Sequence, residues 1–177
     1  LDETINNLEV LKNVKAFHFN FWGGLDLFKY IAHRSKKAAF YQKSGDRIIA
    51  KGPYSIDFKV WCKLIRLAGA DFTHAGMLGG YLDETKGVLE KRFKALMGSS
   101  NNLLGTIPSL SCGATPTHVP LITKHLGNDV MVSSGGAIHA FQDGVTAGAK
   151  AFKDAALGNF ETSEYKMAIE KYGIAEL

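Results

Sequence analysis

The stretch from Met131 to Ala137 reads Met-Val-Ser-Ser-Gly-Gly-Ala and does most to decide the fold. An apolar segment over 129–133 runs directly into small residues and a glycine pair, and an Asp-Gly step at 143–144 opens a helix further on. Glycine lets backbone N–H groups approach an anion closely, and the start of a helix favours negative charge. Strand, glycine turn and helix in this order indicate a phosphate-binding loop.

A second loop of the same kind comes earlier in the chain. Ser109 to Ala114 reads Ser-Leu-Ser-Cys-Gly-Ala, and the two loops are 22 residues apart. We therefore expect them to follow neighbouring strands of one sheet.

Composition restricts the class of protein. The chain has 177 residues, of which 46% are hydrophobic and 21% charged, as in an ordinary globular domain. The net charge is +4, and no run of basic residues is longer than Lys36-Lys37. Scattered charge of this kind indicates a solvated surface and no nucleic-acid partner, while an anionic small substrate fits the basic bias.

Cysteine content and hydropathy suggest a cytoplasmic setting. Cys62 and Cys112 form neither a disulfide framework nor a zinc pattern, so both are expected to be free thiols. There is no signal peptide, and no apolar run approaches the roughly 20 residues that cross a bilayer. We expect no membrane partner.

Short apolar runs alternate with segments of helical periodicity. Strands are expected at 15–22, 37–42, 71–75, 104–111 and 129–133. Helices are expected at 1–13, 24–32, 56–68, 85–97, 116–126, 144–157 and 163–171, and a polar loop around 43–47. The clearest helical face consists of Phe58, Trp61, Leu64, Ile65 and Ala68.

This alternation predicts an α/β fold with a parallel sheet, either doubly wound or a (β/α)8 barrel. Polar and glycine residues at successive strand ends favour the barrel. About five units cannot close a barrel of about 250 residues, and the chain begins inside a helix without Met. We expect residues 1–157 to be the C-terminal portion of a barrel and 158–177 a helical tail; the alternative is an open sheet.

Three segments resemble the C-terminal barrel of the RuBisCO large-subunit superfamily. Residues 64–76 are similar to that family's helix and strand with a substrate-binding histidine, and residues 108–120 to its next strand. Residues 134–149 are similar to its last strand and helix. The resemblance covers nearly the whole chain. The spacing of the motifs agrees with that of the family without gaps over most of residues 56–157, and the match is looser before residue 55.

The resemblance implies a set of substrate-binding residues. His74 and Ser111 would position hydroxyl groups, while Gly113, Gly135 and Gly136 would bind phosphate through backbone N–H groups. Without the resemblance, the same residues read as a strand-end histidine bonded to backbone and as ordinary tight turns.

Two departures from the family pattern point away from carboxylation. The lid loop contains Gly79, Gly80 and Tyr81, and Tyr81 stands where carboxylating members carry a lysine that orients CO2. A phenol lacks the ammonium charge that would stabilise a developing carboxylate. Either Gln42 or Tyr41 stands in place of a family arginine. The chain is therefore most similar to RuBisCO-like proteins of form IV.

The rest of the family's site would come from elsewhere. The resemblance implies Mg2+, a carbamylated lysine and metal-binding carboxylates on an earlier strand, so neither a catalytic residue nor a metal ligand is assigned within this chain. It also implies a homodimer with shared active sites and a phosphorylated small-molecule substrate.

The remaining histidines receive structural interpretations. His18 is expected to be a packed or half-exposed strand residue, and His33-Arg34 to cap a helix C-terminus. His118 and His125 are expected at the surface or barrel rim, and His139 is only weak evidence for a ligand.

Three functions follow from the resemblance. The first is enolisation or isomerisation of a phosphorylated sugar-like substrate, as in methionine-salvage relatives, without CO2 fixation. The second is a non-enzymatic relative with a regulatory or stress-related role, suggested by these two departures and by Ala137, which stands in place of one glycine of the family's final triplet. The third, a true carboxylase, is disfavoured by Tyr81.

Overall fold

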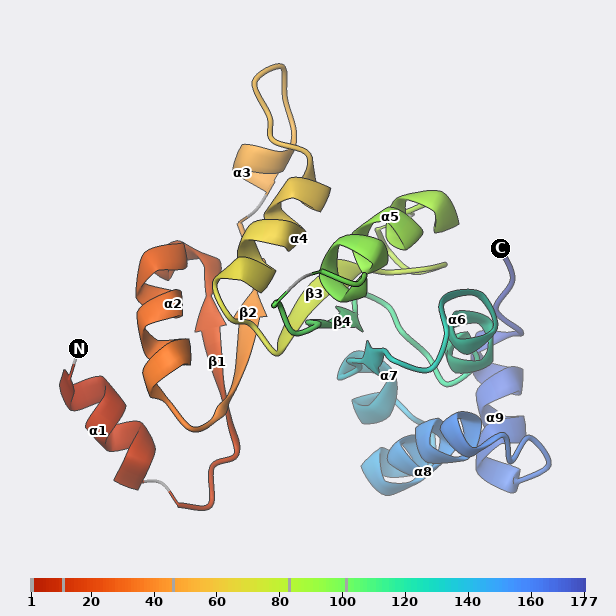
Figure 1. Ribbon diagram of the computed structural model, residues 1–177. Helices are drawn as coiled ribbons and strands as arrows, with labels where there is room; N and C mark the ends of the chain where they lie inside the picture. The colour runs from red at the N-terminus through yellow and green to blue at the C-terminus, as the bar shows by residue number, and fades with distance from the viewer. Residues whose placement is uncertain (1, 11, 46, 83, 101) are drawn as a thin grey trace. The chain divides into compact units, whose positions relative to one another are not determined.

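The computed structural model describes residues 2–10, 12–45, 47–82, 84–100 and 102–177 (Figure 1). The strands are β1 (Ala16–Asn20), β2 (Ala38–Gln42), β3 (Phe72–Gly76), β4 (Ile107–Leu110) and β5 (Met131–Val132). The helices are α1 (Asp2–Val10), the 3-10 helix η1 (Phe21–Gly23), α2 (Leu25–Arg34), α3 (Arg47–Ala50), α4 (Phe58–Leu67), α5 (Lys86–Met97), α6 (His118–Leu126), α7 (Gly136–His139), α8 (Gly144–Leu157) and α9 (Ser163–Tyr172).

The five strands form one sheet in the order β1-β2-β3-β4-β5. The pairs β1–β2, β2–β3 and β4–β5 are parallel, and in the last of these Ser109 lies opposite Met131. A helix follows each strand before the next begins, as parallel pairing requires. The predicted α/β class and its parallel sheet are therefore confirmed.

Three short helices were missed from the sequence. η1 replaces the end of the strand expected over 15–22, α3 begins at the end of the expected loop around 43–47, of which residue 46 lies outside the described residues, and α7 begins inside the second glycine loop. They span three or four residues, which is too short to show helical periodicity. The strand expected over 104–111 is also shorter, because only residues 107–110 pair as β4.

The chain divides into two compact units, which are described separately. Unit 1 comprises Leu1–Ala75 and Lys91–Pro108, and unit 2 comprises Gly76–Glu90 and Ser109–Leu177. The expected division into 1–157 and 158–177 stays a prediction. None of the described helices is long and apolar enough to cross a bilayer.

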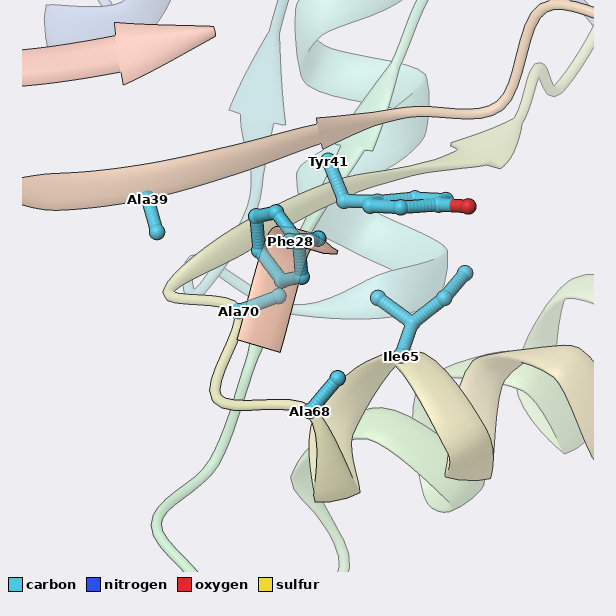
Figure 2. Close-up of a cluster of buried hydrophobic side chains, with 6 residues drawn as sticks. All are labelled: Phe28, Ala39, Tyr41, Ile65, Ala68 and Ala70. Atoms are coloured by element: carbon cyan, nitrogen blue, oxygen red, sulfur yellow. The ribbon is translucent and has the colours of Figure 1, made fainter. Parts of the chain in front are cut away.

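The core of unit 1 lies between helices and one face of its strands (Figure 2). Its buried members are Phe28, Ala39, Tyr41, Ile65, Ala68 and Ala70. Alternation along β2 explains this face, because Ala39 and Tyr41 are buried while Phe40 and Gln42 on the other face are only half-buried. Leu64 was wrongly expected on the buried side of α4; it is 37% exposed because it lies about 100° around the helix from Ile65.

The core of unit 2 joins α9 to the helices before it. Tyr165 of α9 packs with Ala155 of α8 and Val119 of α6, and Ala168 packs with Phe141 and Ala151. The small residues of α8 let α9 approach closely, so the last helix is part of this core.

Arg66 binds several backbone carbonyls of the segment that follows α5 within unit 1. It is only 8% exposed, and its guanidinium donates to the carbonyls of Leu104 and Gly98 at 2.7 Å each and of Leu103 at 2.9 Å. A guanidinium has five N–H donors and can satisfy several carbonyls at once. Arg66 thus links α4 to the segment that leads into β4.

We predict that Arg66→Met lowers the free energy of unfolding by about 3 kcal/mol, because buried carbonyls would lose charged donors. Urea unfolding of the intact protein measures the difference. The matched control is Lys63→Met on an exposed position of the same helix, for which we expect a change within about 0.5 kcal/mol. Equal changes in the two variants would contradict the role of Arg66.

Candidate functional site

His74 lies on β3 of unit 1 and is bonded to a side chain of the neighbouring strand. Its Nε2 is 2.6 Å from Oε1 of Gln42, and the ring packs edge-on against Phe40. Gln42 is the last residue of β2, and its side-chain amide also donates to Oγ of Ser44 at 2.6 Å. Gln42, one of the two residues expected in place of the family arginine, thus orients the proposed substrate-binding histidine.

His18 joins the same group from β1. Its Nε2 is 2.9 Å from Oε1 of Gln42, so one amide oxygen contacts both imidazoles. An amide oxygen only accepts, so His18 and His74 both donate from Nε2. His18 lies on a strand as expected, but it is exposed and neither packed nor half-exposed, and its link to His74 was missed.

Burial and nearby positive charge keep His74 neutral. Its pKa is lowered to about 4, first by desolvation and then by the charges of Lys43 and His18. The ammonium of Lys43 lies 4.7 Å from the centre of the Phe58 ring, where Arg92 packs as well at 4.9 Å. Gln42 carries no charge, but Lys43 adds positive charge near His74. Sequence analysis did not anticipate this charge.

The two glycine loops of unit 2 are joined to each other. Pairing of Leu110 with Val132 brings the ends of β4 and β5 together with the predicted offset of 22 residues. Beyond the strands, Ser134 donates from Oγ to the carbonyl of Ala114 at 2.9 Å. The expectation that the loops follow neighbouring strands is confirmed.

The backbone of each loop differs. Gly113 has φ +94° and Cys112 has φ +80°, so the first turn adopts a left-handed conformation that favours glycine. Gly135 and Gly136 have no such constraint, and a Cβ added at either would meet nothing within 4 Å. Steric crowding within the protein therefore does not require glycine at these two positions. Close approach of a ligand to the backbone is another reason for glycine to stand there.

Unit 2 also contains the lid loop, which contacts the first of these turns. Tyr81 donates its N–H to the carbonyl of Cys112 at 3.0 Å. A Cβ at Gly80 would lie 2.3 Å from that same carbonyl oxygen, so only glycine fits there. The side chain of Tyr81 is 88% exposed, yet its ring would be 3.2 Å from a Cβ added at Gly113.

The described residues do not form a metal site. Nowhere among them do three His, Cys, Asp or Glu side chains gather closely enough to hold an ion. They do not fit Mg2+ by themselves, and no chemical step is assigned to that ion.

The predicted site residues thus fall into two groups. His74 lies in unit 1, whereas Ser111, Gly113, Gly135 and Gly136 lie in unit 2, where the structure brings these four together on adjoining strand ends. Gln42, Lys43 and His118 are contacts that sequence analysis missed. The resemblance had already drawn attention to Gln42, and the register that places β2 beside β3 is the signal for its contact with His74.

Parallel strands followed by helices, with polar loops at the carboxyl ends, define a part of a β/α barrel. A family model described as the ribulose bisphosphate carboxylase large chain, catalytic domain, matches residues 27–172. The chain belongs to this family.

Relatives with two different activities resemble the chain equally. The 2,3-diketo-5-methylthiopentyl-1-phosphate enolase of Geobacillus kaustophilus is 31% identical over 139 residues, which cover 70% of this chain and 33% of the relative. The ribulose bisphosphate carboxylase of Methanocaldococcus jannaschii is 30% identical over 144 residues, which cover 72% and 32%. The chain thus spans about a third of the length of the curated relatives that it matches.

A solved structure shows the same fold. Octameric ribulose-1,5-bisphosphate carboxylase/oxygenase from Pyrococcus horikoshii superposes with a TM-score of 0.86 at 19% identity, covering 99% of this chain and 46% of that chain. The fold is therefore that of the C-terminal barrel part of this family, as the sequence predicts.

We predict that the His74 imidazole titrates near pKa 4 in the folded protein and that Lys43→Gln raises this pKa, because a nearby positive charge is removed. NMR titration of labelled histidine measures both values. Lys29→Gln, at an exposed position of α2, is the control and leaves the His74 pKa unchanged.

The same shift makes stability depend on pH. The unfolded chain binds a proton at His74 near its ordinary pKa of 6.5, and the folded protein does so only near 4. The contribution of neutral His74 is therefore complete above pH 6.5 and is lost as the pH falls towards 4. A folded His74 that titrates near its ordinary pKa would contradict this assignment.

Proposed function

We propose that the chain is the C-terminal portion of a RuBisCO-like protein of form IV that enolises a phosphorylated, sugar-like diketone of the methionine-salvage type. The observation that carries this proposal is Tyr81 in the lid loop. An enolase needs to stabilise an enolate, whereas a carboxylase must also stabilise charge that develops on added CO2. Tyr81 offers a neutral hydroxyl where carboxylating relatives have an ammonium group.

The substrate's phosphate would bind at the adjoined glycine loops of unit 2. Gly135 and Gly136 open α7, where the first N–H groups have no partner within the helix. Gly113 would add an N–H group from the neighbouring turn. The free space around Gly135 and Gly136 supports this reading.

Hydroxyl or carbonyl groups of the substrate would bind to His74 and Ser111. His74 is neutral near pH 7 because its pKa lies at about 4, so it acts as a hydrogen-bonding group and not as a fixed charge. The ligands of Mg2+ and the general base would come from residues outside the present sequence. The active sites would be shared between the two subunits of a homodimer.

A non-enzymatic relative is the second candidate function. The observation that favours it is the contact between the Tyr81 ring and Gly113, because the ring lies against a glycine expected to bind phosphate. A protein of this kind would bind phosphorylated ligands weakly or hold them without turnover.

We predict that the full-length protein catalyses exchange of the proton next to the carbonyl of 2,3-diketo-5-methylthiopentyl-1-phosphate with deuterium from D2O, and that EDTA abolishes this exchange. NMR follows the loss of the proton signal. Binding of the ligand without exchange would favour the non-enzymatic candidate, and measurable CO2 fixation would overturn both.

Gly135→Ala tests the phosphate assignment in the same assay. The added methyl group meets no protein atom within 4 Å, so we expect unchanged stability. It would occupy the space through which the phosphate approaches the backbone, so we expect substrate affinity to weaken at least tenfold. Gly87→Ala, which also adds a methyl group in open space, is the matched control and leaves affinity unchanged. Full affinity in Gly135→Ala would exclude Gly135 from the phosphate site.

A further inference from the structure

Three hydrogen bonds join the lid loop of unit 2 to residues 111–118. Ser111 donates its N–H to the carbonyl of Gly76 at 3.0 Å, at the start of the lid. The carbonyl of Cys112 accepts from Tyr81 at 3.0 Å, at its end. Between these two backbone contacts, the middle of the lid is bonded to a side chain, that of His118.

His118 contacts Gly79 directly. Its Nε2 lies 2.8 Å from the carbonyl oxygen of Gly79, although the two residues are 39 positions apart in the sequence. The ring also packs against Gly79, because an added Cβ would lie 3.4 Å from two ring atoms, at van der Waals contact. Gly79 itself has φ +73°, so the lid is bent sharply at the point of contact.

The turn before α6 sets the tautomer of this imidazole. The N–H of Thr115 lies 3.2 Å from Nδ1 of His118, and the hydroxyl of Thr115 lies 2.7 Å from the same atom. A backbone N–H can only donate, so Nδ1 accepts and the neutral ring carries its proton on Nε2. The Nε2–H group therefore donates a hydrogen bond to the carbonyl oxygen of Gly79.

We propose that His118 is a positioning residue of the lid: it fixes the carbonyl of Gly79 and so holds Tyr81 over the Ser111–Gly113 turn. The hydroxyl and N–H of Thr115 select the tautomer that makes this contact. Its effect on catalysis rests on the proposed function, because that turn is where we expect the substrate to bind.

The position of the side chain explains why this contact matters. The lid has no regular secondary structure between Met77 and Leu82, so its conformation depends on the burial of Met77 and Leu78 and on its hydrogen bonds. Glu84 accepts from the N–H of Met77 at 3.0 Å, and Gly80 packs closely against the carbonyl of Cys112. Loss of the His118 contact removes the side-chain hydrogen bond at Gly79, which lies between these two points.

Two substitutions separate the two nitrogens of His118. In His118→Asn, Oδ1 replaces Nδ1 as the acceptor for Thr115, but no donor reaches Gly79. In His118→Gln, the amide nitrogen can reach Gly79 in place of Nε2. A structural role in the turn alone predicts that Asn is tolerated better, whereas the lid role predicts that Gln is.

Hydrogen exchange of residues 77–82 in the intact protein is the test. We expect His118→Asn to speed exchange there about fivefold, the effect of one net hydrogen bond, and His118→Gln to stay within twofold of the wild type. Exchange in α8 and α9 should not change in either variant. Unchanged lid exchange in His118→Asn, or equal acceleration in both variants, would overturn the proposal.

Enolisation kinetics provide the second readout. With a smaller fraction of lids in the competent position, we expect KM to rise about fivefold in His118→Asn with kcat within twofold, and rescue in His118→Gln. A fall in kcat at constant KM would contradict a positioning role. If the wild-type protein shows no enolisation, the proposed function fails, whereas the lid role is still decided by hydrogen exchange.

Discussion

Parallel pairing of the strands is the constraint on which the other features depend. Because parallel strands end at the same edge of a sheet, loops far apart in sequence become neighbours wherever their strands pair. In unit 1 this brings Gln42 beside His74, and in unit 2 it brings the loop after Leu110 beside the loop after Val132. Both contacts follow from the parallel pairing of neighbouring strands, although they involve different residue types. A slip of one residue would turn each side chain to the opposite face and separate them.

Much of the fold could be predicted from the sequence, because its signals are local. Apolar alternation revealed five strands, and glycine turns at strand ends indicated the barrel class. The short helices α3 and α7 escaped because four residues carry no periodic signal. In the site, glycine loops were visible as motifs, whereas the contacts of Gln42, Lys43 and His118 were not. Each of these depends on a partner from another element, and single-sequence patterns do not encode such pairings.

The differences from carboxylating relatives form a consistent chemical change. By resemblance to carboxylating relatives, we infer that Tyr81 stands in place of a lysine in the lid and that Gln42 or Tyr41 stands in place of an arginine on β2. Gln42 bonds two imidazoles. Both changes replace a fixed positive charge by a neutral hydrogen-bonding group. Relatives with enolase and carboxylase names are equally similar over the whole match, so the choice between these activities rests on such individual positions. Lys43 places positive charge near His74.

We propose that the adjoined glycine loops of unit 2 form a phosphate site beside the lid that contains Tyr81. The decisive experiment is a crystal structure of the full-length protein with an unreactive phosphorylated diketone analogue. We expect phosphate oxygens within hydrogen-bonding distance of the N–H groups of Gly135 and Gly136, with the Tyr81 lid over the ligand. Phosphate bound away from both glycines, or a ligand excluded from them by Tyr81, would contradict it.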